Sequence, residues 1–210
     1  MDELSNLIEV NHPLLKDKIA KMRDSSTSPS EFRRLLKEIS ALMTYEACRN
    51  FETVIKTVES PLEKASAKIL KREIAVVPIL RAGLGMINGI LSIIPEARIG
   101  MLGLYCDENT LQPVDYYTNL PQNLQEMEVM LVDPMLATGG SAKEAVNTLK
   151  RNGAKRLTMM SLIVAPEGVK TMEAAHPDVK VYTAVLDRQL NEKGYILPGL
   201  GDAGDRCFGT

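Results

Sequence analysis

The sequence predicts a single α/β domain over residues 1–210, with a parallel sheet covered by helices on both faces. Near-continuous apolar runs, of which residues 74–80 are the clearest, alternate with helical patterns as far as residue 184. A length of 210 residues fits one domain. Hydrophobic residues form 45% and charged residues 25% of the chain, as in ordinary globular proteins.

The N-terminal part is expected to begin with two helices. Residues 13–23 have a helical pattern, and a second helix is expected over residues 29–49. Its start carries Ser28 as the N-cap, Pro29 in the first turn and Glu31 completing a capping box. Apolar side chains then recur at helical spacing, so this helix should pack on the core or on a second subunit.

The rest of the chain should form the sheet and its covering helices. Further helices are expected over residues 61–70, 84–94, 141–152 and 167–175, and strands over residues 52–58, 74–80, 99–104, 129–132, 157–164 and 179–184. The polar residues 105–126 break the alternation, which favours a mobile flap in which residues 114–117 form one arm of a hairpin. Ligands of such sheets bind at the carboxyl ends of the strands.

Composition excludes several classes of function. A net charge of −2 gives no strong field for nucleic acid or a membrane, and the absence of Trp argues against base-stacking platforms. No apolar run is long enough to span a bilayer. The three cysteines form no Cys-x-x-Cys pair, which favours the cytoplasm, and two histidines make a zinc site improbable.

The most informative segment is a glycine loop between an expected strand and an expected helix. Asp133 follows the strand, and Thr138, Gly139, Gly140 and Ser141 lead into the helix. The glycines let backbone N–H groups converge on a phosphate, and the helix start adds unpaired N–H groups. Asp133 is placed to accept hydrogen bonds from ribose hydroxyls. The spacing matches neither an ATPase P-loop nor a dinucleotide fingerprint.

A second segment follows the strand 74–80. Arg81 stands where this strand ends, and its guanidinium is suited to bidentate phosphate binding. Small residues at Ala82, Gly83 and Gly85 allow close approach of the backbone to a ligand. Together with the first loop, this turn predicts one site for a 5-phosphate and another for a diphosphate.

The third segment is the tail, residues 194–210. Its glycines are interleaved with apolar anchors at Tyr195, Ile196, Leu200 and Phe208. This pattern favours an ordered but irregular segment whose backbone points into the site.

The three segments, in this order and spacing, resemble the uracil phosphoribosyltransferases, a branch of the type I phosphoribosyltransferases. The resemblance extends from about residue 10 to residue 210, and it includes Asp133-Pro134 where most type I members have two acids. It implies the type I fold and transfer of the 5-phosphoribosyl group from 5-phosphoribosyl 1-diphosphate (PRPP) to N1 of uracil. The products would be UMP and diphosphate, as in pyrimidine salvage, with Mg²⁺ bound mainly through substrate and water.

The resemblance also implies roles for individual residues. The expected PRPP-binding residues are Arg81, Cys106, Asp133, Pro134, Met135, Leu136, Ala137, Thr138, Gly139, Gly140, Ser141 and Asp202, those expected to bind uracil are Ile196, Gly201, Asp202 and Ala203, and those expected to act in catalysis are Arg81, Asp133 and Asp202. Asp205 and Arg206 are expected to form either a structural ion pair or part of the catalytic machinery. A non-proline cis peptide is expected beside Arg81 or Ala82.

Cys106 departs from the family pattern, because the family usually has an arginine at this position. A thiol supplies neither a fixed positive charge nor a forked donor. Either PRPP binding is weaker, or another cation such as Arg98 or a neighbouring subunit compensates.

Several alternatives remain open from the sequence. The base could be another one, such as a purine, because specificity depends on the tail. The chain could instead be a PRPP- or UMP-sensing, RNA-binding regulator, or a degenerate enzyme, on the same fold. The resemblance also suggests a homodimer or larger homo-oligomer and GTP as a possible effector.

Overall fold

The computed structural model describes residues 4–106 and 113–210, without the side chains of residues 105–115. The helices are α1 (Pro13–Arg23), α2 (Pro29–Ala47), α3 (Leu84–Leu91), α4 (Gly140–Arg151), α5 (Pro166–Ala175) and α6 (Ala203–Phe208), with a 3₁₀ turn at Leu124–Glu126. The strands are β1 (Leu7–Glu9), β2 (Thr53–Glu59), β3 (Lys64–Leu70), β4 (Ile74–Leu80), β5 (Arg98–Ile99), β6 (Met101–Cys106), β7 (Pro113–Asn119), β8 (Glu128–Val132), β9 (Met135–Leu136), β10 (Leu157–Val164), β11 (Lys180–Leu186), β12 (Gln189–Leu190) and β13 (Ile196–Leu197).

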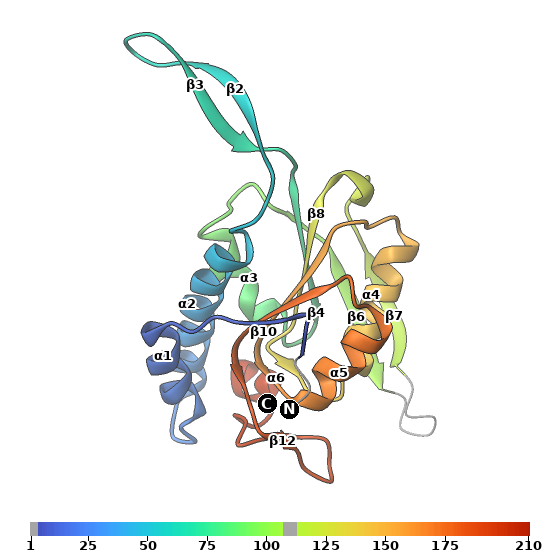
Figure 1. Cartoon of the computed structure of the whole chain (residues 1–210). Helices are drawn as coiled ribbons and strands as arrows, with labels where there is room; N and C mark the ends of the chain where they lie inside the picture. Colours follow the sequence, from blue (N-terminus) through green and yellow to red (C-terminus); the bar gives the residue numbers. More distant parts are fainter. Residues whose placement is uncertain (1–3, 107–112) are drawn as a thin grey trace.

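The central sheet has the strand order β1-β11-β10-β8-β4-β6-β7, with β5 beside β4 and β9 beside β10 (Figure 1). Its pairings are parallel except for that between β6 and β7. The predicted α/β fold with a parallel sheet is confirmed. Since β4, β8, β10 and β11 run the same way, their carboxyl ends lie at one edge, where Arg81 and Asp133 follow their strands.

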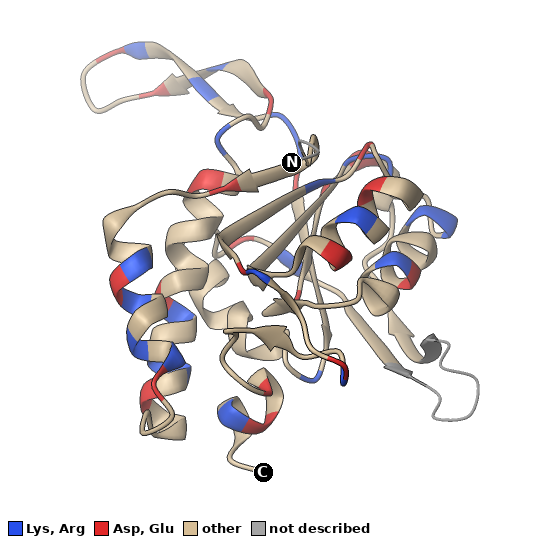
Figure 2. Ribbon diagram, turned by 60° about the horizontal axis from the view of Figure 1, so that its bottom comes forward, with Lys and Arg blue, Asp and Glu red and all other residues tan. Residues whose placement is uncertain are grey.

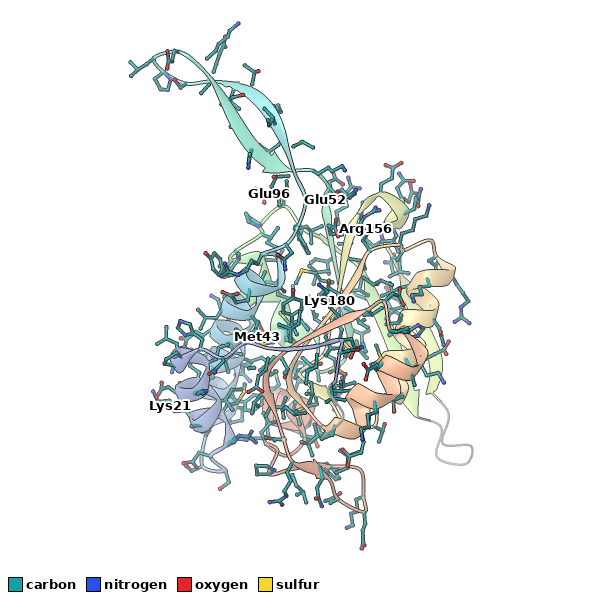
Figure 3. The ribbon with its side chains drawn as sticks, in the orientation of Figure 1. Lys21, Met43, Glu52, Glu96, Arg156 and Lys180 are labelled. Carbon is teal, nitrogen blue, oxygen red and sulfur yellow. The ribbon has the colours of Figure 1, made fainter. Side chains whose placement is uncertain are left out.

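Alternate residues of the strands pack on opposite faces of the sheet. Val76 and Met130 belong to the cluster that includes α1, α2, α3 and α6, and Figure 3 shows Met43 of α2 in this layer. Val77 and Leu131 belong to the cluster that includes α4 and α5. Strands buried on both faces explain the continuous apolar runs in the sequence.

The start of α2 agrees with the predicted capping. The hydroxyl of Ser28 accepts a hydrogen bond from the backbone N–H of Glu31 at 3.3 Å, and Pro29 is the first helical residue. The stripe of apolar side chains that includes Phe32 and Leu36 is fully buried. Helix α3 is shorter than expected, ending at Leu91 instead of residue 94.

The helix expected over residues 61–70 is wrong, because this segment is the second arm of the β2–β3 hairpin. Pro61 lies in the four-residue turn 60–63, where the backbone N–H of Ser60 donates to the carbonyl of Glu63. Alanine, lysine and leucine favour a helix when isolated, but here the alternation of Lys64, Ser66 and Lys68 with apolar residues fits the pairing with β2. The hairpin projects from the body (Figure 1).

The segment expected to be a flap is partly regular. Strand β7 pairs antiparallel with β6, so the predicted hairpin arm at residues 114–117 is confirmed. Residues 107–112 of the expected flap lie outside the described residues, and mobility of the flap stays a prediction. Among the described residues, no helix has the length and apolar character that a membrane span requires.

Candidate active site

A pocket of about 250 Å³ lies at the carboxyl ends of β4 and β8, where the three motifs of the sequence meet. Its wall is formed by Ile79, Leu80, Arg81, Ala82, Leu104, Asp133, Ser141, Asp202 and Gly204. The arginine turn, the glycine loop and the tail thus each contribute to one cavity.

The arginine turn is held close to the end of β8. A Cβ on Gly83 would lie 2.7 Å from the carbonyl oxygens of both Ile79 and Val132, so only glycine fits there. The Leu80–Arg81 peptide is cis, which confirms the cis bond expected beside Arg81. The Arg81 guanidinium is largely exposed, and its Nη2 lies 3.3 Å from Oδ1 of Asp205. It is therefore available to an anionic ligand at modest cost.

The glycine loop places the open start of α4 beside the pocket. Gly139 precedes the helix with φ of +85°, and the cap has no side-chain hydrogen bond. The backbone N–H of Gly140 meets only a long contact, 3.5 Å, to Oγ1 of Thr138. A Cβ on Gly139 would lie 2.8 Å from Cβ of Thr171, because the loop packs on α5. Unsatisfied N–H groups at a helix start suit an anion such as a phosphate.

The first residues of this loop are tied to β10. The carbonyl of Pro134 accepts hydrogen bonds from the N–H groups of Leu162 and Ile163, and Met135 and Leu136 form β9. The side chain of Leu136 is buried in the core. This part of the loop supports the open turn at 137–140, and direct contacts of Pro134 to Ala137 with PRPP stay a prediction.

Asp133 has an unusual electrostatic environment. Burial raises the pKa of its carboxyl to about 7; a hydrogen bond from the Met135 backbone partly opposes this shift, and the negative charge of Asp202 adds to it. The hydroxyl of Ser161 donates to the carbonyl oxygen of Asp133 at 2.7 Å and fixes the backbone at the strand end. An acid with a raised pKa beside a second acid in a pocket is typical of functional sites.

The tail is more regular than expected. Strands β12 and β13 pair antiparallel, and α6 begins after Asp202, whose Oδ1 accepts from the N–H of Asp205 at 2.9 Å. The tail approaches the glycine loop, since a Cβ on Gly194 would lie 3.7 Å from Cγ2 of Thr138. The prediction of an irregular tail is therefore wrong for residues 196–197 and 203–208, where local capping and strand pairing order the chain.

Of the tail residues expected to bind uracil, the structure places only some at the pocket. Asp202 lines the pocket, while Ile196 and Ala203 are buried and Gly201 is exposed with φ of +79°. Their contacts with a base stay a prediction.

The predicted ion pair between Asp205 and Arg206 is not formed. Asp205 pairs with Arg81, whereas Nη1 of Arg206 donates to the carbonyls of Met22 and Leu200 at 2.6 and 2.9 Å. Adjacent positions on a short helix point these two side chains in different directions.

Two residues near the tail, Asp187 and Arg23, were not predicted from the sequence. Asp187 is 6% exposed, and its carboxylate makes a bidentate ion pair with Arg23, with contacts of 2.6 and 2.8 Å. Asp187 directly follows β11 at the functional edge of the sheet, a position that also made Asp133 noticeable. Nothing in the sequence indicates its partner on α1.

The expectations for Cys106 and Arg98 can be compared with the structure only in part. The backbone of Cys106 ends β6, and its side chain lies outside the described part of the chain. Arg98, considered as a compensating cation, pairs with Glu73 at 2.8 Å and begins β5 beside Ala75 near the amino end of β4, away from the pocket. It is therefore poorly placed to replace the missing arginine.

Within the described residues, no group of three His, Cys, Asp or Glu side chains is arranged to hold a metal ion.

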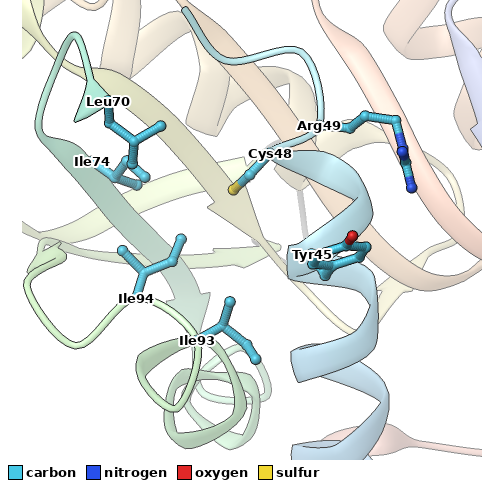
Figure 4. Close-up of a pocket in the computed structure, with 7 residues that line it drawn as sticks. All are labelled: Tyr45, Cys48, Arg49, Leu70, Ile74, Ile93 and Ile94. Atoms are coloured by element: carbon cyan, nitrogen blue, oxygen red, sulfur yellow. The ribbon is translucent and has the colours of Figure 1, made fainter. Parts of the chain in front are cut away.

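A second pocket lies at the opposite end of β4. It is lined by Tyr45, Cys48, Arg49, Leu70, Ile74, Ile93 and Ile94 (Figure 4). Its wall is mainly apolar and contains none of the motif residues, so we assign the chemistry to the pocket at Arg81 and Asp133.

The fold is that of the type I phosphoribosyltransferases. A hypoxanthine-guanine phosphoribosyltransferase from Bacillus anthracis shares the fold, with a TM-score of 0.54 over 76% of this chain and 80% of that one, at 16% identity. The AQ2163 protein from Aquifex aeolicus is far more similar, with a TM-score of 0.92 and 38% identity over 96% and 97% of the two chains.

Sequence comparison identifies the family. The family model for uracil phosphoribosyltransferase matches residues 9–210. The uracil phosphoribosyltransferase of Dictyoglomus turgidum is 55% identical over 97% of this chain and 99% of its own length. That of Clostridium botulinum strain Eklund 17B is 53% identical over 99% and 100%. The chain belongs to the uracil phosphoribosyltransferase family.

Proposed function

We propose that this chain transfers the 5-phosphoribosyl group from PRPP to N1 of uracil, giving UMP and diphosphate. The observation that carries the proposal is the convergence of Arg81, Asp133, Ser141 and Asp202 on one pocket. Membership of the uracil phosphoribosyltransferase family supplies the identity of the base and of the donor.

The residues suggest a division of labour along the substrate. The open start of α4 and the hydroxyls of Thr138 and Ser141 would hold the 5-phosphate. Asp133 would accept hydrogen bonds from the ribose hydroxyls once ionised. Arg81, which lines the same pocket and is largely exposed, would stabilise the departing diphosphate.

Catalysis would depend mainly on positioning. The bond from C1 of the ribose to the diphosphate would loosen first, leaving an oxocarbenium-like sugar that N1 of uracil attacks with inversion. Holding the 5-phosphate and the base at fixed points turns this attack into an intramolecular step. The β6–β7 hairpin is positioned beside β4, and closure of the flap over the sugar would exclude water.

The pocket fits Mg²⁺ bound through the substrate. Asp133 and Asp202 place two carboxyl groups near one another, and the described residues provide no cage of three ligands. Mg²⁺ prefers phosphate oxygens and waters to an all-protein cage. Asp202 would hold a metal-bound water, and the ion would neutralise charge on the diphosphate.

Recognition of uracil would come from the backbone of the tail. Uracil presents acceptor, donor and acceptor groups along O2, N3–H and O4, which backbone N–H and C=O groups match. Cytosine presents the opposite groups at N3 and C4, so it would leave buried polar groups unpaired, and such sites reject a ligand strongly.

The proposal includes a homodimer or larger assembly. Ile55 and Leu62 on the β2–β3 hairpin are 73% and 95% exposed, and the apolar pocket of Figure 4 lies at its base. Exposed apolar surface on a projecting hairpin is expected to be covered by a partner. Light scattering on the native chain and on a variant with residues 55–68 replaced by a short turn would test this contact.

The remaining proposals depend on the family resemblance. A GTP effector would raise the rate of UMP formation, and adding GTP to the assay tests it. A cytoplasmic location agrees with the free thiols of Cys48 and Cys207. Charges of both signs are interspersed along the helices (Figure 2), a pattern that does not favour the RNA-binding alternative.

The decisive experiment measures nucleotide formation from PRPP and Mg²⁺ with uracil, cytosine, hypoxanthine and orotate in parallel. Activity with uracil alone is expected. Activity with a purine instead would overturn the assignment of the base, and PRPP binding without activity on any base would favour a regulatory or degenerate protein.

A further inference from the structure

An ion pair fixes the backbone shortly before Gly201, Asp202 and Ala203, three of the four residues expected to bind uracil. The carboxylate of Asp187 accepts two hydrogen bonds from the guanidinium of Arg23, with Nη1 to Oδ2 at 2.8 Å and Nη2 to Oδ1 at 2.6 Å. The side chain of Asp187 is 4% exposed and that of Arg23 is 22% exposed. Such a pair, largely removed from water, is rigid in geometry.

The same pair satisfies both polar groups of one tail residue. The backbone N–H of Gly199 donates to Oδ2 of Asp187 at 2.9 Å, and its carbonyl oxygen accepts from Nη1 of Arg23 at 2.6 Å. Gly199 has φ of +60°, and a Cβ there would lie 2.1 Å from the carbonyl oxygen of Ile196. The tail therefore makes a tight turn at Gly199, held from outside by charged groups.

A second arginine, Arg206, connects the tail to the end of α1. Arg206 of α6 donates from Nη1 to the carbonyl of Leu200 at 2.9 Å and to that of Met22 at 2.6 Å, and from Nη2 to that of Asp24 at 2.5 Å. Its guanidinium also stacks over the ring of Phe32, 4.8 Å from the centroid. Arg23 thus reaches from α1 into the tail, and Arg206 reaches from the tail to the end of α1.

These contacts hold the tail on both sides of its base-reading stretch. Gly199 and Leu200 precede Gly201, Asp202 and Ala203 in the chain, and Arg206 follows them. We propose that Arg23, Asp187 and Arg206 are positioning residues that set the affinity for uracil and the discrimination against cytosine. The inference rests on the proposed function, because it assigns these residues to the base subsite of that reaction.

The physical reason lies in how a backbone reads a base. Backbone N–H and C=O groups discriminate by direction, so a small displacement of the turn weakens the matched hydrogen bonds and relaxes rejection of mismatched ones. Apart from Cys106 and Asp202, the residues expected to hold PRPP lie in the glycine loop and the Arg81 turn. Neither segment has a described hydrogen bond to Arg23, Asp187 or Arg206, which together we call the clamp. Loosening the clamp should therefore affect binding of the base much more than binding of PRPP.

The test compares Asp187→Asn and Arg23→Lys with the native enzyme. The asparagine keeps the shape but turns an NH₂ group towards one of the donors, and the lysine keeps the charge but loses the fork. We expect Asp187→Asn to raise KM for uracil about tenfold or more, with KM for PRPP changed by less than about twofold. Arg23→Lys should show a smaller change in the same direction, and both should narrow the ratio of kcat/KM for uracil to that for cytosine.

A matched control separates positioning from general loss of stability. Glu128 pairs with Arg72 at 3.0 Å, and their side chains are 14% and 19% exposed, at the amino end of β8 and far from the pocket. Glu128→Gln should lower the melting temperature, as the clamp variants do, but leave both KM values unchanged. Kinetics are measured well below the melting temperature of each variant.

The outcomes distinguish the inference from the proposed function. A native enzyme that forms no UMP overturns the proposed function and this inference with it. A native enzyme that forms UMP, with KM for uracil unchanged in the variants or raised in parallel with KM for PRPP, overturns the inference alone. If Asp187→Asn does not fold, Arg23→Lys and Arg206→Lys decide by the same criterion.

Discussion

The glycine loop at residues 133–141 and the tail at residues 194–210 approach each other at one pocket, but they are built in opposite ways. The loop joins β8 to α4, and its backbone is ordered by the strand before it, the helix after it and neighbouring β10. The tail has only short regular elements, and the carbonyl of Gly199 is bound by a side chain 176 residues away.

The difference follows from what each segment is expected to bind. A phosphate needs converging N–H groups, which any open helix start supplies. A base edge needs donors and acceptors in a fixed order, which a regular element does not present at one point. Local structure therefore suffices for the phosphate, whereas the base requires a backbone shaped by distant contacts.

The largest effect is expected when Asp133, the acid in the pocket where the loop and the tail meet, loses its charge. We expect Asp133→Asn to lower kcat/KM by about a hundredfold or more, because an amide cannot act as an ionised acceptor for both ribose hydroxyls. Steady-state UMP formation measures the effect. Asp17→Asn, an exposed acid paired with Lys21 on α1, is the control and should keep full activity. Retention of activity in Asp133→Asn would remove the ribose role.

Two glycine substitutions should show that the tail determines KM for uracil and the glycine loop KM for PRPP. Gly199→Ala would force the tail turn to open, since the new Cβ lies 2.1 Å from a backbone oxygen. We expect KM for uracil to rise about ten- to a hundredfold, with a loss of stability of roughly 1–3 kcal/mol. Gly139→Ala, with φ of +85° in the native chain, should instead raise mainly KM for PRPP.

The control for this pair is Gly153→Ala. Gly153 has φ of +91° but lies after α4, where a Cβ would lie 3.5 Å from Oε1 of Gln125, an ordinary contact distance. In Gly153→Ala, backbone strain at positive φ should lower the melting temperature and leave KM for uracil and KM for PRPP unchanged. If Gly199→Ala and Gly139→Ala raise the same KM, the two regions do not act separately.

A smaller effect is expected at Cys106, where the family resemblance implies an arginine. Cys106→Arg should lower KM for PRPP by about tenfold, which corresponds to one charge-assisted contact of roughly 1.5 kcal/mol. Cys106→Ser, which removes the thiol without adding a charge, should leave KM unchanged. No change in the arginine variant would show that this position does not contact the diphosphate.

The sequence predicted the loop better than the tail for a physical reason. Apolar runs, glycines and the capping residue Ser28 act within a few residues of their own position. Most strands and helices of the sheet could therefore be predicted, as could the place of Asp133 at the end of a strand. Strand β2 was predicted as a strand, but β3 was mistaken for a helix because its exposed residues have no core-facing pattern to oppose their helix propensity. The clamp of Arg23 on Asp187 joins positions 164 residues apart, and no local pattern announces it.

The smallest expected effect is on the free energy of unfolding, and it tests whether burial of the Asp133 carboxyl destabilises the folded chain. Burial raises the pKa of this acid to about 7 from an ordinary value of about 3.9. Between these values the folded chain binds more protons than the unfolded chain, so the contribution of Asp133 to stability falls as the pH rises from about 4 to 7. Asp133→Asn does not titrate and escapes this loss.

Thermal unfolding of both proteins without ligand, in the presence of a chelator, measures the difference. Near pH 4 we expect similar melting temperatures. The pKa difference corresponds to an upper bound of about 4 kcal/mol. Because Asp133 is partly exposed, we expect the variant at pH 8 to be more stable by roughly 1–2 kcal/mol, or about 2–8 °C for a chain of this size. A variant that is inactive and yet more stable at pH 8 would show that the acid is kept for binding rather than for folding. A difference in melting temperature that is independent of pH would mean that Asp133 has the same pKa in the folded and unfolded chains, and that the pocket solvates its charge as well as water does.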